Sequence, residues 1–250
     1  MIVLVAGGTG FVGRHVVNAL KRRGHQVVVH HRGFRAIPTH ADAIVNLVGI
    51  IREGSQTFVG AHVGKTRQLL RLGKKYKVRQ FVQVSALGAR DDGTPYQRTK
   101  FQAEELVRRS GLPYAIIRPS VIFGPSDRSI NKFRAVARTG FLPLFGNGTV
   151  QPVSVETVAS VVAAAVERRI RDRIAEVGGP EVFTYRQLAY RIHPGVRAFL
   201  LPSPIRALLT FIGRFLPPLP TPDMERMLWE HNTTGDRTVE RLGVRNPRLT

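Results

Sequence analysis

Residues 2–13, Ile-Val-Leu-Val-Ala-Gly-Gly-Thr-Gly-Phe-Val-Gly, decide the fold of this chain. The five apolar residues at 2–6 are typical of a buried strand, and glycines at GxxGxxG spacing separate them from an amphipathic stretch with helical periodicity. In such a turn, Gly7 permits tight folding, Gly10 lets a pyrophosphate approach the backbone, and Gly13 lets helix and strand pack closely. We therefore expect a dinucleotide-binding turn, the alternative being a turn with no ligand. The residues assigned to it are Gly7, Gly8, Thr9, Gly10, Phe11, Val12 and Gly13.

The rest of the first half alternates short β-branched runs with amphipathic stretches, which predicts an α/β protein with a Rossmann-type, doubly wound parallel sheet. Strands are expected near residues 2–6, 27–31, 43–48, 80–85 and 114–118, and helices near 11–23, 57–75 and 96–110. We expect residues 1–125 to form the dinucleotide-binding core. Residues 126–250 are expected to form a small C-terminal substrate region packed on that core, with helices near 155–169 and 184–192 and a strand near 175–178 that returns to the sheet.

The composition excludes several classes of protein. The chain has 250 residues, 38 Lys+Arg and 17 Asp+Glu, hence a formal charge of +21, and it has no cysteine. Disulfide frameworks, thiolate metal sites and cysteine nucleophiles are therefore excluded, and the histidine spacing predicts no metal site. The basic residues are spread along the expected helices, so we expect no specific nucleic-acid binding. The apolar start lacks the basic region of a targeting signal, and we expect a cytoplasmic protein, soluble or peripheral to a membrane.

A candidate acid–base pair follows the fourth strand. Tyr96 and Lys100 form a YxxxK pattern at the start of a helix, where residues four apart share one face. We expect the ammonium to lower the pKa of the phenol and to hold a ribose hydroxyl, while Tyr96 exchanges a proton with a carbonyl or carbinol. Ser85, at the end of the preceding strand, is placed to orient the same oxygen. YxxxK alone occurs by chance, but its position after the glycine turn makes it specific.

The end of the second strand favours NADP(H) over NAD(H). A site that prefers NAD usually has an acidic residue there to accept a hydrogen bond from the ribose, whereas this chain has His31, Arg32 and Arg35 and no carboxylate in the segment. Arginine pairs well with a 2′-phosphate. The alternative interpretation is that these are ordinary solvated charges in a basic chain.

These motifs, together with residues 118–125, Arg-Pro-Ser-Val-Ile-Phe-Gly-Pro, resemble the extended and atypical short-chain dehydrogenase/reductase superfamily, which is NAD-dependent epimerase/dehydratase-like. The similarity is greatest to the branch related to the nucleotide-binding accessory subunit of respiratory complex I, and it extends over roughly residues 1–192. The resemblance implies that further residues contact the cofactor and its nicotinamide. They are Leu47, Val48, Gly49, His62, Pro119, Ser120, Val121 and Ile122.

Two functions are expected from this resemblance. The first is an NADP(H)-dependent oxidoreductase or epimerase-like enzyme that acts on a small-molecule carbonyl or carbinol through Tyr96 and Lys100. The alternative is a non-catalytic NADPH-binding subunit or redox sensor that docks on a membrane or protein partner, because the complex I branch shows that the fold does not prove turnover.

The chain departs from the superfamily in two places. Only nine residues, 33–41, separate Arg32 from Asp42, which is too few for a helical crossover, so we expect one edge βα unit to be missing. His30, His31 and Arg32 would then lie on an exposed edge. The loop between Ser85 and Tyr96 is also short, which puts the role of Ser85 in doubt more than that of Tyr96.

Residues 199–222 contain a short, apolar and cationic helix flanked by prolines. It could lie in a membrane interface, with Arg206 and Arg214 attracted to anionic lipid. The alternative is a helix packed over the substrate cleft or against a second subunit, as in a homodimer.

Overall fold

The core of the protein is a six-stranded sheet in which all neighbouring strands are parallel, in the order β2-β1-β3-β4-β5-β10. A computed structural model describes residues 1–30, 39–127, 130–217 and 219–249. The strands are β1 (Ile2–Ala6), β2 (Gln26–His30), β3 (Ala43–Asn46), β4 (Gln80–Val84), β5 (Tyr114–Pro119) and β10 (Arg173–Val177). The predicted Rossmann-type sheet is confirmed, and the segment near 175–178 does return to it.

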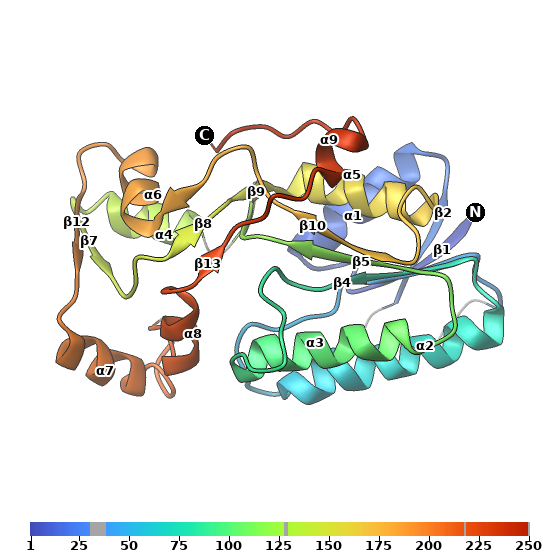
Figure 1. The fold of residues 1–250 in the computed structure, drawn as a ribbon, viewed down its shortest axis with the longest axis horizontal. Helices are drawn as coiled ribbons and strands as arrows, with labels where there is room; N and C mark the ends of the chain where they lie inside the picture. The colour runs from blue at the N-terminus through green and yellow to red at the C-terminus, as the bar shows by residue number, and fades with distance from the viewer. Residues whose placement is uncertain (31–38, 128–129, 218, 250) are drawn as a thin grey trace.

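Helices cover both faces of this sheet (Figure 1). One face carries α1 (Phe11–Arg22) and α5 (Val155–Val166), and the other carries η1 (Val59–Gly64), α2 (Lys65–Tyr76) and α3 (Pro95–Arg108). Each face has its own apolar core, built from the inward side chains of the strands. Burial of such apolar surface is the main source of stability in a three-layer fold of this kind.

Local sequence explains where the helices begin and end. α3 starts with a capping box, in which the Thr94 side chain accepts from the backbone of Gln97 and the Gln97 side chain accepts from the backbone of Thr94. α2 ends at Lys77, which adopts a left-handed conformation with φ of 51°. α5 is a run of valine and alanine that is buried along almost its whole length, because α1 and the sheet enclose it.

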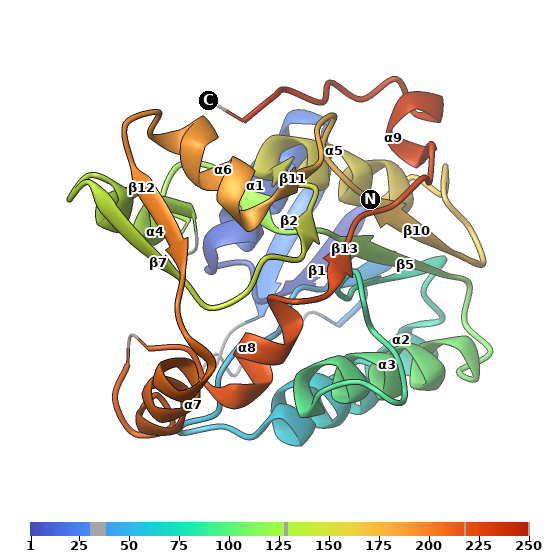
Figure 2. The same cartoon turned by 60° about the vertical axis from the view of Figure 1, so that its left-hand side comes forward.

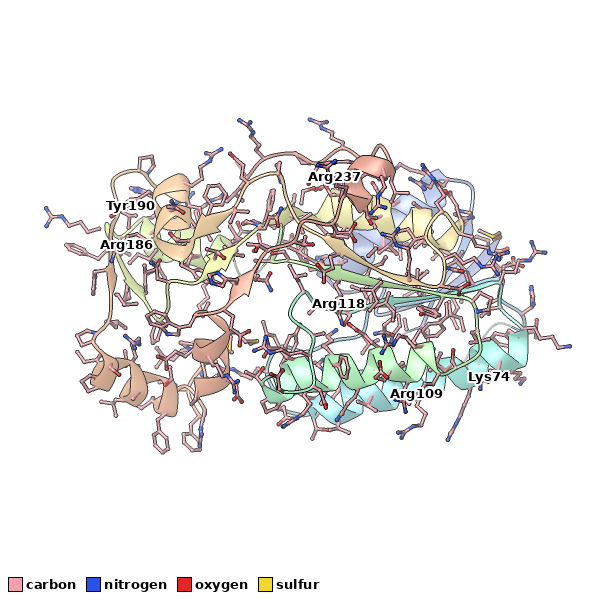
Figure 3. All side chains as sticks on the ribbon, in the orientation of Figure 1. Lys74, Arg109, Arg118, Arg186, Tyr190 and Arg237 are labelled. Atoms are coloured by element: carbon pink, nitrogen blue, oxygen red, sulfur yellow. The ribbon has the colours of Figure 1, made fainter. Side chains whose placement is uncertain are left out.

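A buried ion pair fixes α3 on the sheet. Arg118 of β5 lies between the sheet and α3 (Figure 3), and its Nη2 is 2.6 Å from Oε2 of Glu104. The Glu104 side chain is 1% exposed, so its charge depends on this partner. Arg118 also lies 3.6 Å from the Glu176 carboxylate of β10, and the pair therefore links α3 to two strands.

The second half of the chain adds a smaller lobe at the carboxyl end of the sheet (Figure 2). Its short strands are β6 (Ile122–Phe123), β7 (Phe141–Leu144), β8 (Thr149–Val150), β9 (Val153–Ser154), β11 (Phe183–Thr184), β12 (Arg197–Leu200) and β13 (His231–Asn232). Its helices are α4 (Ile130–Ala137), α6 (Tyr185–Ile192), α7 (Ser203–Ile212) and α8 (Pro222–Met227). After β13 the chain returns to the core, where α9 (Thr238–Arg241) lies beside β10.

The edge of the sheet agrees with the sequence prediction at β2 and differs from it at His30. β2 forms the edge of the sheet in the described part of the chain, as expected for a missing βα unit. The predicted exposure of His30 is wrong, because this residue is only 8% exposed and Nζ of Lys65 lies 2.9 Å from its Nε2. Lys65 begins α2, and its side chain reaches the last residue of β2. His31, Arg32 and Arg35 lie outside the described residues.

Phe81 offers a test of the core. Its side chain, on the second residue of β4, is 0% exposed, so Phe81→Ala is expected to lower the free energy of unfolding by about 3 to 5 kcal/mol. Urea denaturation measures this change. Arg186→Ala, an exposed substitution on α6, serves as the control and is expected to change the free energy by less than about 0.5 kcal/mol. A Phe81→Ala protein as stable as that control would contradict the assignment of the core.

Candidate functional site

The glycine turn brings the start of α1 directly onto the end of β1. Gly7 has φ of +80°, and its carbonyl accepts from the Gly10 N–H at 3.1 Å. A Cβ on Gly13 would lie 2.1 Å from that same carbonyl oxygen, so no side chain fits there. α1 has no side-chain cap and no acidic residue in its first turn, which leaves its N-terminal N–H groups available for an anion.

A buried polar network shapes the turn after β3. Asn46 donates to Oε1 of Gln83 at 2.9 Å and to Oγ1 of Thr66 at 3.0 Å, while its own oxygen accepts from the Val48 N–H at 3.1 Å. The chain therefore bends at Leu47 and comes close to the glycine turn, since a Cβ on Gly7 would lie 3.1 Å from the Leu47 carbonyl carbon. The structure brings these two predicted cofactor segments together.

His62 is buried beneath the candidate acid–base pair. It lies in the π-helical turn η1, a feature frequent at functional sites, and it is 1% exposed. Its Nε2 accepts from the Ile50 N–H at 3.2 Å and its Nδ1 lies 2.9 Å from Oγ1 of Thr99, contacts that a neutral ring satisfies. The ring stacks on Phe58 and meets Tyr96 edge-on, with centroids 5.5 Å apart for the second pair. Burial, with a smaller effect of the neighbouring Lys100 charge, lowers the pKa of His62 to about 3.

Lys100 points toward the carboxyl ends of β3 and β4. Its Nζ is 3.4 Å from the Val84 carbonyl oxygen, and a Cβ on Gly49 would lie 2.9 Å from Nζ. Burial lowers the pKa of Lys100 to about 8, and the Glu104 carboxylate opposes that shift. Burial also raises the pKa of Tyr96 to about 12. The expectation that the ammonium lowers the phenol pKa therefore differs from the structure, in which desolvation dominates.

The Ser85 hydroxyl is a polar atom without a partner. Ser85 directly follows β4, where its N–H donates to the Ile117 carbonyl at 2.7 Å, and the residue is 5% exposed. Its Oγ is buried and makes no hydrogen bond within the described residues. A buried hydroxyl that lacks a partner is costly, and it fits a site that a bound polar group completes.

Residues 228–234, here called the C-terminal strap, lie beside the segments that follow β4 and β5. The Glu230 carboxylate accepts from Nη1 of Arg90 at 3.0 Å and from Nε2 of Gln97 at 2.6 Å. Gln97 is the residue after Tyr96, so the strap is fixed next to the candidate acid–base pair. Sequence reasoning missed this contact, because the strap and Gln97 are more than a hundred residues apart and no motif marks Glu230.

Asn232 fixes the other end of the strap. Its Nδ2 donates to the Leu87 carbonyl at 3.0 Å, and its Oδ1 accepts from the Ser120 hydroxyl at 2.6 Å. Ser120, one of the predicted nicotinamide-side residues, therefore holds the strap in this structure. Its neighbours Val121 and Ile122 lead into β6, and Pro119 ends β5.

The protein has a parallel sheet between two layers of helices, a glycine turn after the first strand and a Tyr-Lys pair in the helix after the fourth strand. These features define the class of dinucleotide-binding, short-chain dehydrogenase/reductase-like proteins. Residues 3–178 match the NAD dependent epimerase/dehydratase family, and the chain belongs to that family.

Proteins similar in sequence include one named as a subunit of NADH dehydrogenase and one named as a reductase. The chain is 30% identical to NADH dehydrogenase [ubiquinone] 1 alpha subcomplex subunit 9, mitochondrial, from Arabidopsis thaliana, over 90% of this chain and 67% of that protein. It is 28% identical to ceramide reductase of Caulobacter vibrioides, over 65% of this chain and 60% of that protein. UDP-glucose 4-epimerase of Thermotoga maritima has the same fold, with a TM-score of 0.73, 18% identity and coverage of 100% of this chain and 94% of that one.

The low pKa of His62 makes a prediction about pH. An unfolded histidine binds its proton near pH 6.5 and the folded one only near 3, so stability contributed by the neutral ring is lost as the pH falls below about 6.5. Over that range the free energy of unfolding should fall by up to about 1.4 kcal/mol per pH unit because of this residue. His62→Gln is expected to remove that slope, as measured by urea denaturation between about pH 5 and 7. Parallel curves for the two proteins would contradict a neutral, buried His62.

Proposed function

We propose that the chain binds NADP(H) and is an oxidoreductase or epimerase-like enzyme that acts on a carbonyl or carbinol of a small molecule. The observation that carries this proposal is the buried Ser85 hydroxyl without a partner, at the strand end toward which Lys100 points. A substrate oxygen is the group that would accept a hydrogen bond from the Ser85 hydroxyl and another from the Lys100 ammonium.

The residues that would hold the dinucleotide fit it. The turn at residues 7–13 offers backbone N–H groups, and Gly10, where an added Cβ would meet only the Gly7 carbonyl oxygen at 3.4 Å, leaves the backbone open to a diphosphate. The segment at 47–49 and the residues from 119 to 122 would lie on the nicotinamide side, with His62 and Lys100 beneath it. When bound, the reduced dinucleotide supplies a hydride.

Tyr96 would act as the general acid in the direction of reduction. A pKa raised to about 12 keeps its phenol protonated at neutral pH, so it can donate a proton to a carbonyl oxygen that Ser85 orients. Lys100, with a pKa of about 8, remains charged in a majority of molecules at pH 7, and it would hold a ribose hydroxyl and stabilise the phenolate left after proton transfer.

The preference for NADP(H) rests on the charge at the end of β2. Arg32 and Arg35 were assigned to the 2′-phosphate from the sequence alone. Among the described residues, Lys65 adds a cation there, since its Nζ contacts His30, the last residue of β2. Burial lowers the pKa of Lys65, and an anion beside it would relieve that cost.

A second candidate is a non-catalytic NADPH-binding subunit or redox sensor. The similarity to a protein named as a complex I subunit supports partnership with another protein. The C-terminal strap also supports it, because Glu230 and Asn232 occupy hydrogen-bonding groups next to Tyr96 and Ser120 that a substrate would otherwise use. A cytoplasmic location and homodimerisation through a surface other than α2 and α7 remain parts of the proposal.

Tyr96→Phe separates these two functions. If the chain is an enzyme, loss of the phenol proton lowers the rate of NADPH oxidation with a reducible carbonyl compound by about 100-fold or more, with NADPH affinity unchanged by titration calorimetry. Tyr190→Phe, on the exposed face of α6, is the control. Equal rates for wild type and Tyr96→Phe would contradict the acid–base role, and NADPH binding without turnover of any carbonyl compound tested would favour the subunit.

Lys65→Ala tests the cofactor preference. The change is expected to weaken NADPH binding by about tenfold, because a cation near the 2′-phosphate is lost, and to leave NADH binding unchanged. Lys75→Ala, on the exposed side of the same helix, is the control. Tighter binding of NADH than of NADPH by the wild type, or an equal loss for both dinucleotides, would contradict the preference.

A further inference from the structure

α7 presents an apolar face that the other described residues leave uncovered. Thr210 is its only buried residue, and large apolar side chains along one side of the helix and its extension are between 46% and 77% exposed. They are Ile205, Leu208, Phe211, Phe215 and Leu216. Ile205, Leu208, Phe211 and Phe215 are spaced by three or four residues, which puts them on one stripe that Leu216 extends. The other described residues, those around the candidate site included, therefore do not cover this face, and a contiguous apolar stripe of this kind marks a contact surface.

The polar side of α7 is what fixes it on the molecule. Arg206 pairs with the Glu225 carboxylate of α8 at 2.8 Å and lies over the Trp229 ring, 5.1 Å from its centroid. Arg206 thus faces inward, contrary to the expectation that it reaches lipid. Arg214 is exposed and lies 5.7 Å from the centre of the Phe211 ring, so a cation borders the apolar stripe. α7 is held in one orientation with its apolar stripe outward.

A basic surface lies level with α7. Figures 1 and 2 are related by a rotation about the vertical axis, and in both views α7, α2 and α3 lie along the lower edge, so one flat surface can contact all three helices. α2 has no acidic residue and carries exposed cations at Arg67, Arg71, Lys74 and Lys75. Figure 3 labels Lys74 and Arg109 along this edge. The apolar stripe of α7 and the exposed cations of α2 therefore lie on the same side of the molecule.

We propose that the apolar stripe of α7 and the exposed cations of α2 together bind the surface of an anionic phospholipid bilayer. α7 would lie in the plane of the interface with its phenylalanines among the acyl chains, while the cations of α2 contact headgroup phosphates. No helix within the described residues is long and apolar enough to cross a bilayer, and this mode of binding needs none. The proposal is independent of the dinucleotide site.

Charge argues for lipid over a second copy of the chain. Each copy carries a formal charge of +21, and two copies meeting through these helices would bring basic surfaces together. An anionic bilayer complements both the exposed cations of α2 and the apolar stripe of α7. Stable attachment to a membrane requires two such contributions, one electrostatic and one apolar.

Vesicle flotation tests the proposal with the full chain. We expect binding to vesicles of phosphatidylcholine with phosphatidylglycerol and little binding to phosphatidylcholine alone. Phe211→Ser with Phe215→Ser should lower the partition coefficient at least about tenfold, because two aromatic side chains no longer enter the bilayer. Arg71→Glu with Lys74→Glu should lower it comparably, because attraction to the headgroups becomes repulsion. Val182→Ser and Arg186→Glu change exposed residues away from this face and should bind as the wild type does.

Three results would overturn the proposal. They are no binding to anionic vesicles, binding that both double variants retain, and a wild-type dimer in sedimentation equilibrium without lipid that Phe211→Ser with Phe215→Ser dissociates. The last result would show that a second copy covers α7. Leu208→Gln, whose expected loss is smaller, provides a second apolar variant, and unchanged urea denaturation of each variant establishes that it is folded.

Discussion

The close approach of α1 to the turn after β1 is the constraint on which the rest of the structure depends. Because Gly13 rests on the Gly7 carbonyl, the helix starts at the strand end and aims its N-terminus at the edge where the other strands also end. That edge gathers the bend at Leu47, the Ser85 hydroxyl and the Lys100 ammonium. A side chain at position 13 would push α1 away from the sheet and separate its N–H groups from them.

The site combines groups whose protonation is set by burial rather than by mutual attraction. His62 stays neutral, Tyr96 stays protonated, and Lys100 loses part of its preference for the charged form. In the function that we propose, the protonated Tyr96 is the group that donates a proton. The C-terminal strap lies beside these groups, where Glu230 contacts Gln97 and Asn232 contacts Leu87.

Sequence patterns predict the core well, because its strands and helices are local and strongly periodic. The glycine turn and the edge position of β2 could be predicted from residues 2–13 and from the short connection before Asp42. The burial of His30 could not, because it depends on α2 placing Lys65 over the end of β2. The π-helical turn at His62 and the C-terminal strap could not be predicted from the sequence either, because each depends on tertiary contacts that leave no short motif.

We propose that a dinucleotide binds between the glycine turn and the Tyr96 side of the sheet. A crystal structure of the chain grown with NADPH tests it most directly. We expect the diphosphate over residues 7–13 and the nicotinamide beside Ser85 and Tyr96. NADPH bound at any other place, or bound without contact to the turn, would contradict it.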